Sequence, residues 1–287
     1  MEQKLSELSR LDLTKYIHAA NYVQKYRQWT KLTQIQQDAF ASQLNSYVSY
    51  LKSNSRIKGF DFKEISERTK LLNGYYDYCD ENFKNVFTSQ GKFRSTILEE
   101  FLVILFQDLV ENIKEDINDQ DDKLQIGGIQ AYTNLFFSAR NLQDFIVAPN
   151  IGINVKNQDF AIYRPITINI ETADRVLANI PIVSIESKTY MDKTMLEGSI
   201  ATAEKLKSGN PYTLFLIVTE TWEVDLSVDP AYSRIDQIFV LRKSNTRQVR
   251  QPIHPEVLMH LVDLVNLHLH RNWSDVGHKL RTDGMII

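Results

Sequence analysis

The stretch that decides the fold reads Ile182-Val183-Ser184-Ile185-Glu186-Ser187-Lys188. Apolar and polar residues alternate in it, which is the pattern of a β-strand with one buried face. Successive side chains on a strand point to opposite faces, so Glu186 and Lys188 share one face while Val183 and Ile185 share the other. A carboxylate and an ammonium group are therefore expected on the same face at the end of a strand.

The stretches around this strand predict an α/β fold. Four of them are rich in Ile and Val and are interpreted as strands, namely residues 151–163, 166–170, 212–219 and 235–242. One helix is predicted over residues 194–207, ended by Ser208-Gly209-Asn210-Pro211, and a second over residues 255–270. The carboxy-terminal two thirds of the chain is therefore expected to hold strands flanked by helices.

The first 90 residues predict helices. Apolar residues recur there at helical spacing, and eight of the 13 tyrosines lie before residue 80. These tyrosines are either core residues of a helix bundle or a surface that stacks on bases or packs on a partner. A boundary is predicted at Ser89-Gln90-Gly91, with Ser95 or Thr96 capping an apolar helix over residues 97–113. The chain thus divides into a helical region, residues 1–90, and an α/β region, residues 91–287.

The composition excludes several classes of protein. The single cysteine, Cys79, excludes an internal disulfide framework and a thiolate zinc site within one chain. The longest unbroken apolar run, residues 101–106, is too short to cross a membrane, and the amino terminus has no apolar signal segment. The P-loop, GxGxxG, GxSxG and HExxH signatures are absent from the sequence. We therefore expect a soluble, cytoplasmic protein without a membrane partner.

The charge is distributed unevenly along the chain. The net charge is −3, but residues 1–90 carry 13 basic and 10 acidic side chains. Much of the negative charge lies in residues 99–122, which hold nine acidic residues and one lysine. A mildly negative total therefore does not exclude a basic surface that binds DNA.

Asp159 provides a second carboxylate for the strand end. It lies in the strand-like stretch Gln158-Asp159-Phe160-Ala161-Ile162-Tyr163, and two antiparallel neighbours would bring it close to Glu186. Two carboxylates can bind a hard divalent cation such as Mg²⁺, which keeps several waters and accepts a phosphate oxygen. Lys188 would orient the attacking water or help to deprotonate it. The trio predicts phosphodiester hydrolysis, and the alternative is an exposed Glu–Lys pair on an edge strand.

Glu100 is a candidate for an additional metal ligand. It lies between Ile97 and Ile104 at helical spacing, which turns it partly toward the inward face. An acid on an apolar face is costly unless it is paired or binds a metal. The alternative is a rim carboxylate at the amino end of a helix, where the helix dipole favours it.

A basic stretch follows the last predicted strand. It has four cations and no acid within ten residues, and it precedes the prolines at the start of the last long helix, so an exposed loop is expected. Arginine and glutamine are suited to reading guanine and adenine edges. The loop is either a DNA contact or an ordinary solvated loop, and the candidate DNA-binding residues are Arg242, Lys243, Arg247, Arg250 and Gln251.

These residues resemble a known nuclease superfamily. Asp159 followed by Glu186-Ser187-Lys188 resembles the PD-(D/E)xK motif, which many type II restriction endonucleases carry. Two flanking stretches, Ser95-Thr96-Ile97-Leu98-Glu99-Glu100-Phe101 and Thr189-Tyr190-Met191-Asp192-Lys193-Thr194-Met195-Leu196, are similar to the BbvCI-like restriction enzymes. The resemblance covers residues 92–218. Gln158 stands where the motif has a proline.

The resemblance implies a mixed β-sheet flanked by helices and an Mg²⁺-dependent endonuclease that cuts a specific sequence in double-stranded DNA. It implies that Asp159 and Glu186 bind the metal and that Lys188 serves the attacking water. Enzymes of this kind cut an asymmetric DNA sequence with two different but related subunits, each of which supplies one active site. We therefore expect a second subunit, either a related chain or a copy of this one. The helical region lies outside the resemblance, and we interpret it as a region for DNA recognition or subunit pairing.

Three alternatives remain open from the sequence. The chain could be a DNA-binding or pairing subunit on the same fold without its own chemistry. It could be a repair nuclease that recognises the structure of DNA. The third alternative is a regulatory helical domain joined to an unrelated α/β fold.

Overall fold

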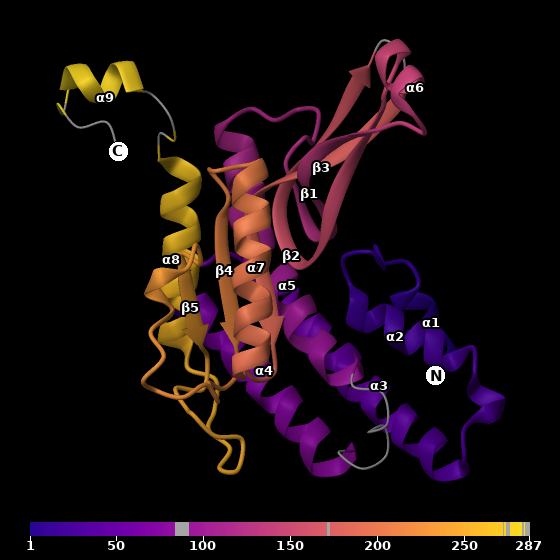
Figure 1. Ribbon diagram of the computed structural model, residues 1–287. Coiled ribbons are helices and arrows are strands. Elements are labelled where there is room, and N and C mark those ends of the chain that lie inside the picture. Colours follow the sequence, from indigo (N-terminus) through magenta and orange to yellow (C-terminus); the bar gives the residue numbers. More distant parts are fainter. Residues whose placement is uncertain (84–91, 171–172, 272, 274–275, 283, 285–287) are drawn as a thin grey trace.

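The amino-terminal region is helical (Figure 1). The computed structural model describes residues 1–83, 92–170, 173–271, 273, 276–282 and 284. The first elements are α1 (Glu2–Leu8), α2 (Ile17–Tyr26), the 3-10 turn η1 (Trp29–Lys31), α3 (Gln34–Asn54) and α4 (Phe62–Phe83). The alternative left open for the tyrosines is decided for five of them, because Tyr22, Tyr47, Tyr50, Tyr75 and Tyr76 are buried.

The rest of the described chain is an α/β unit. A capping box at Thr33 starts α3, and the side chain of Asp192 accepts a hydrogen bond from the backbone N–H of Met195 at the start of α7 (Lys193–Gly209). The elements are α5 (Lys92–Asp116), β1 (Gln125–Ser138), α6 (Leu142–Val147), β2 (Asn150–Ile170), β3 (Ala173–Lys188), α7 (Lys193–Gly209), β4 (Leu214–Thr219), η3 (Pro230–Tyr232), β5 (Gln237–Val240), α8 (Pro255–His270) and α9 (Val276–Thr282).

The sheet is mixed. Its strand order is β1-β2-β3-β4-β5. β1 and β3 are each antiparallel to β2, whereas β4 is parallel to β3 and β5 is parallel to β4. The expected mixed sheet flanked by helices is therefore confirmed. β1 also pairs with β3 through Ala131 and Asn179, so the first three strands curl into an arm that projects from the core, with α6 at its far end (Figure 1).

Helices cover both faces of the sheet core. The face that carries Val183 and Ile185 packs with α5 and α8, whereas α7 covers the opposite face with Leu196, Ala203 and Leu206. Every residue of β4 is buried, as expected for a parallel strand between two helical layers. The strand end that carries Glu186 and Lys188 is thus held from both sides.

Several sequence predictions need correction. α5 begins at Lys92, so Ser95 and Thr96 lie inside the helix, and Thr96 donates a hydrogen bond to the carbonyl of Phe93 instead of capping. Residues 151–163 and 166–170 belong to one strand, β2, and β1 was not predicted at all. The proposed boundary at residues 89–91 lies outside the described residues.

One apolar interior joins the two regions that the sequence separates. It extends from Leu5 in α1 to Val265 in α8 and includes residues of the sheet. Among the described residues, we find no helix long and apolar enough to span a membrane.

Candidate active site

The strand register explains why Asp159 and Glu186 meet. β2 and β3 are antiparallel, and the last pair of their ladder at this end is Phe160 with Ile185. The next residue on each strand is Asp159 and Glu186, so the two acids face each other where the ladder stops. The carboxylate of Asp159 takes over the role of a ladder partner, because its Oδ2 accepts a hydrogen bond of 2.8 Å from the backbone N–H of Ser187.

A β-bulge lies at the same place. Gly127 pairs with Ala161 and Ile129 with Gln158, so two residues of β2, Asp159 and Phe160, oppose the single residue Gly128. A bulge changes the direction of the side chains next to it and is common beside active sites. The backbones are close here, since a Cβ atom on Gly128 would lie 3.3 Å from the carbonyl oxygen of Asp159.

Lys188 completes the cluster. Its Nζ lies 3.2 Å from Oδ2 of Asp159 and 3.9 Å from Oε2 of Glu186. The three side chains are between 13% and 32% exposed. The structure thus brings the three sequence-predicted residues together at a partly open edge of the sheet.

Two polar residues not singled out from the sequence support the trio. Ser199 on α7 donates a 2.5 Å hydrogen bond to Oε2 of Glu186, and it is itself buried. Ser184 donates a 2.6 Å hydrogen bond to the side chain of Gln158, the residue before Asp159. Only contacts between distant segments reveal these roles, so no local pattern in the sequence indicates them.

The donor set fits a magnesium ion. Within the described ranges, no group of three or more His, Cys, Asp or Glu side chains forms a metal site. Mg²⁺ does not need three, because it is usually bound by one or two carboxylates together with waters and substrate phosphates. Asp159 and Glu186 supply two such carboxylates, and each has further acceptor capacity beyond the hydrogen bonds described above.

The structure does not bring Glu100 to this cluster. Glu100 is carried inward by α5, as its spacing predicts, but into the helical region. Its Oε2 accepts hydrogen bonds from the backbone N–H groups of His18 and Ala19, and Tyr47 donates to its Oε1. It therefore caps the amino end of α2, which satisfies the carboxylate without a metal. Burial raises the pKa of Glu100 to about 7, against the effect of these three donors.

The predicted DNA-binding residues are engaged within the chain. Arg242 is buried and pairs with Glu220, and it also donates to the backbone carbonyl of Gln251. The other three cations pair with acids that are distant or follow the loop: Lys243 with Glu256, Arg247 with Glu223, and Arg250 with Asp77 and Asp80. The loop is therefore tied down by ion pairs, and only part of its positive charge faces solvent.

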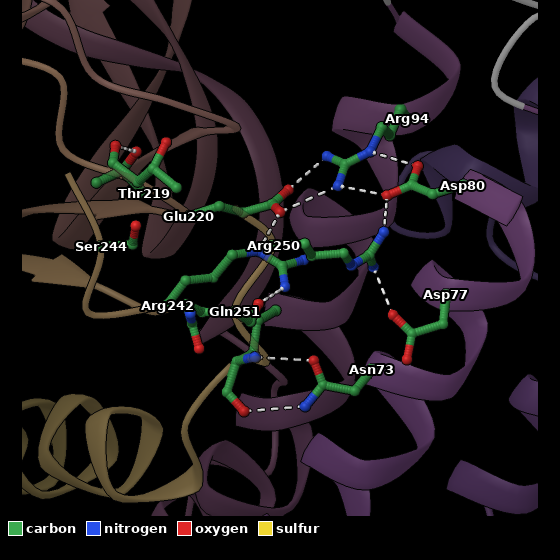
Figure 2. Close-up of polar contacts among 12 residues, drawn as sticks. Asn73, Asp77, Asp80, Arg94, Thr219, Glu220, Arg242, Ser244, Arg250 and Gln251 are labelled. Atoms are coloured by element: carbon green, nitrogen blue, oxygen red, sulfur yellow. Dashed lines mark hydrogen bonds and ion pairs between the residues drawn. The ribbon is translucent and has the colours of Figure 1, made fainter. Parts of the chain in front are cut away.

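Glu220 is the centre of a second charged cluster, shown in Figure 2. Its carboxylate binds Arg94 of α5 at 2.6 Å and Arg242 at 2.8 Å, and Arg94 continues the network to Asp80 of α4. Burial acts to raise the pKa of Glu220, but the two guanidinium groups lower it below its usual value. The cluster adjoins the trio, because the backbone N–H of Glu220 donates to the carbonyl of Lys188. The sequence signal for Glu220 is an acid directly after the apolar strand β4, and it resembles that of Glu186, which lies near the end of β3.

The chain is similar to known proteins both in sequence and in fold. The sequence profile of the Bpu10I restriction endonuclease matches residues 90–252, which is more than half of the chain. The chain belongs to the Bpu10I restriction endonuclease family. The predicted resemblance to restriction endonucleases is therefore confirmed. A search of curated proteins finds no match.

A solved structure extends the similarity of this Bpu10I-family chain to its helical region. The structure is described as the native BbvCI A2B2 tetramer at low resolution, and it matches with a TM-score of 0.67 at 19% sequence identity. The match covers 90% of this chain and 97% of the other, so it includes much of α1–α4, which precede the residues matched by the family profile. The fold of this Bpu10I-family member is thus shared along nearly the whole chain.

Proposed function

We propose that this chain is an Mg²⁺-dependent, sequence-specific DNA endonuclease, a subunit of a type II restriction enzyme that hydrolyses one phosphodiester bond per active site. The observation that carries the proposal is the meeting of Asp159, Glu186 and Lys188 at one edge of the sheet. Membership in a restriction endonuclease family supports the reaction class. Such an enzyme acts in the cytoplasm, where its double-stranded DNA substrate lies.

Each group of the trio has a distinct task. Asp159 and Glu186 would hold the ion, which supplies charge neutralisation at the phosphate and lowers the pKa of a bound water. Lys188 lies between the two carboxylates, where its compact charge can orient the attacking water and offset the charge of the phosphate. Ser199 holds the Glu186 carboxylate in place through its hydrogen bond.

A complete break of duplex DNA requires two such sites. One chain carries one trio, so the proposal requires a second subunit, either a copy of this chain or a related one. The similar BbvCI structure is an A2B2 tetramer, which supports an assembly of several subunits.

The test uses long unmethylated duplex DNA, such as a phage genome, incubated with the purified chain and Mg²⁺. We expect discrete fragments or site-specific nicks, and no cleavage by the Glu186→Gln and Lys188→Ala variants. Lys123→Ala is the matched control, because Asp121 and Lys123 form another acid-x-lysine pair and lie on an exposed turn. If either active-site variant is folded and cuts at the parental rate, the assignment of the site is wrong.

The same assay separates the alternative functions. A subunit that only binds or pairs would leave DNA intact with Mg²⁺ at every chain concentration. A structure-specific repair nuclease would cut branched DNA whatever its sequence and would not produce discrete fragments from a long duplex. Sequencing of the fragment ends would then identify the recognition site.

A further inference from the structure

The exposed face of the β1–β2 pair leads directly to Asp159. On β1, Ile129 is buried in the same cluster as the residues of α7, whereas its neighbour Gln130 is exposed. Gln130 lies opposite Asn157 of β2, which is exposed as well. Alternate residues of a strand share a face, so Asn157 and Asp159 point to the same side of β2. Two amide side chains therefore lie next to the trio on an open surface.

Gln130 and Asn157 form what we define as the amide pair. β1 and β2 contain eight Asn or Gln residues in all, although Asn is disfavoured in strands. Five of the others have side-chain partners in the chain or a place outside this face, as in the hydrogen bonds Gln125–Asp122, Asn154–Asn134 and Ser184–Gln158. The amide groups of Gln130 and Asn157 form no hydrogen bond with any described residue, and only their backbone carbonyls accept one. Each amide group thus keeps its donors and its acceptor for an external partner.

The position of the amide pair fits a duplex whose phosphodiester is held by the trio. Asn157 is two residues from Asp159, which is about 7 Å along the strand. Successive phosphates of one DNA strand are about 3.4 Å apart along the helix axis, so the base pair about two steps from the cleaved bond would lie over the amide pair. Gly128, opposite Asp159, is exposed and has no side chain that could separate the two. The nucleotides next to a phosphate bound by the trio therefore meet this face.

The width of the β1–β2 pair suits the major groove of DNA. The groove is about 12 Å wide and admits a two-stranded β-ribbon, whose side chains then reach the base edges. Figure 1 shows β1 and β2 running side by side from the sheet core into the arm. The amide pair lies on the part of this ribbon that is nearest to the trio.

The charge around the amide pair favours a polyanion. Lys156 is the only charged residue within residues 125–134 and 150–158, so no carboxylate in these stretches repels a phosphate. Lys156 is exposed and forms no ion pair with a residue that the structure describes. Phosphate contacts of this kind fix the position of a protein on DNA, whereas contacts to base edges select the sequence.

We propose that Gln130 and Asn157 are specificity-determining residues that bind the edge of an adenine in the major groove beside the cleaved bond. A carboxamide accepts a hydrogen bond from N6 of adenine and donates one to N7, which makes adenine its preferred base. The inference rests on the proposed function and deepens it, because it names the side chains that select the sequence.

The test selects bound sequences from a pool of random DNA duplexes, using the full chain with Glu186→Gln so that binding is measured without cleavage. We expect an enriched sequence that contains an adenine, and loss of the preference at that position in Gln130→Ala or Asn157→Ala. Affinity for the enriched sequence should fall about tenfold to a hundredfold. Asn157→Asp keeps the size of the side chain but removes its donor, so the preferred base should change from adenine to cytosine.

Asn154→Ala is the matched control. Asn154 is also an exposed amide of β2, but its place in the alternation is opposite to that of Asn157, so the enriched sequence should stay the same. The proposal is overturned if the chain enriches no sequence, or if Gln130→Ala and Asn157→Ala both enrich the same sequence as their parent. Cleavage of the enriched sequence by the chain with Glu186 intact is measured separately. A chain that selects a sequence through the amide pair but does not cut it with Mg²⁺ contradicts the proposed reaction and supports this assignment.

Discussion

Two charged clusters lie side by side at the ends of β3 and β4, and they differ in how deeply their charges are buried and how closely they are paired. Glu220 and Arg242 are 3% and 4% exposed and form a short ion pair with each other, and Glu220 forms a second one with Arg94. Asp159, Glu186 and Lys188 are more exposed and lie at distances of 3.2 and 3.9 Å. The buried cluster ties distant segments of the fold together through close ion pairs, whereas carboxylates with free acceptor capacity can still bind an ion and a substrate. The chemical type of a residue therefore does not separate the two roles, but its partners do.

The largest expected effect is the loss of cleavage when a member of the trio is replaced. Asp159→Asn should reduce cleavage about a thousandfold or more, because the ion would lose one of its two charged ligands. The free energy of unfolding should change little, since Asp159 is partly exposed. Single-turnover cleavage and urea unfolding measure the two quantities. A large loss of stability with little loss of cleavage would show that the trio is structural.

The second prediction concerns the buried cluster. Glu220→Gln should lower the free energy of unfolding by about 3–5 kcal/mol, because the buried Arg242 would lose its carboxylate partner and Arg94 would be left with Asp80. Glu223→Gln is the control: its partner Arg247 is half-exposed, so the expected change is below about 1 kcal/mol. Equal effects in urea unfolding would contradict the assigned difference between the two acids.

The third prediction uses the raised pKa of Glu100. Its ordinary pKa is 4.5 and burial raises it to about 7, so its stabilising contribution is complete below pH 4.5 and is lost as the pH rises to about 7. Glutamine does not titrate. The free energy of unfolding of Glu100→Gln, relative to that of the wild type, should therefore rise by about 3 kcal/mol between these pH values. Urea unfolding of both proteins from pH 4.5 to 8 measures the difference. A difference that is independent of pH would contradict the raised pKa.

The smallest expected effect tests whether Ser199 holds the carboxylate of Glu186 in place. Ser199→Ala should weaken the apparent affinity for Mg²⁺ in the cleavage assay by about tenfold, because Glu186 would lose the group that orients it. Thr202→Val on the same helix removes a hydroxyl that donates only to the carbonyl of Gly198 and should leave the affinity unchanged. A matching shift in both variants would assign the effect to the helix and not to the carboxylate.

The sequence predicted the elements whose patterns are local. The limits of α8, Pro255–His270, agree with the prediction, because Pro255 starts the helix and the apolar residues keep a regular spacing to its end. The strand that carries Glu186 and Lys188 was found from its alternation, and its acid and lysine lie where that pattern placed them. β1 escaped prediction because Gly127 and Gly128 interrupt its pattern and its last five residues are exposed on both faces.

The predictions that depended on distant partners fared differently. The helical spacing of apolar residues around Glu100 correctly indicated that its side chain points inward. This spacing could not show that the hydrogen-bond donors come from α2 and from Tyr47. In the same way, the basic loop contains no acid of its own, and its partners Asp77 and Asp80 are about 170 residues away in the sequence. Pairing between distant segments is a property of the fold that spacing does not encode.

The shared apolar interior determines how the chain comes apart. Leu5 and Val265 belong to one continuous interior, and Asn73 of α4 binds both the backbone N–H and the carbonyl of Ile253. Removing either end of the chain would expose the apolar face of the other, so a fragment without α1–α4 or without α8 would tend to aggregate. Heating should accordingly give one cooperative melting transition for the intact chain, in which the helices and the sheet are lost together.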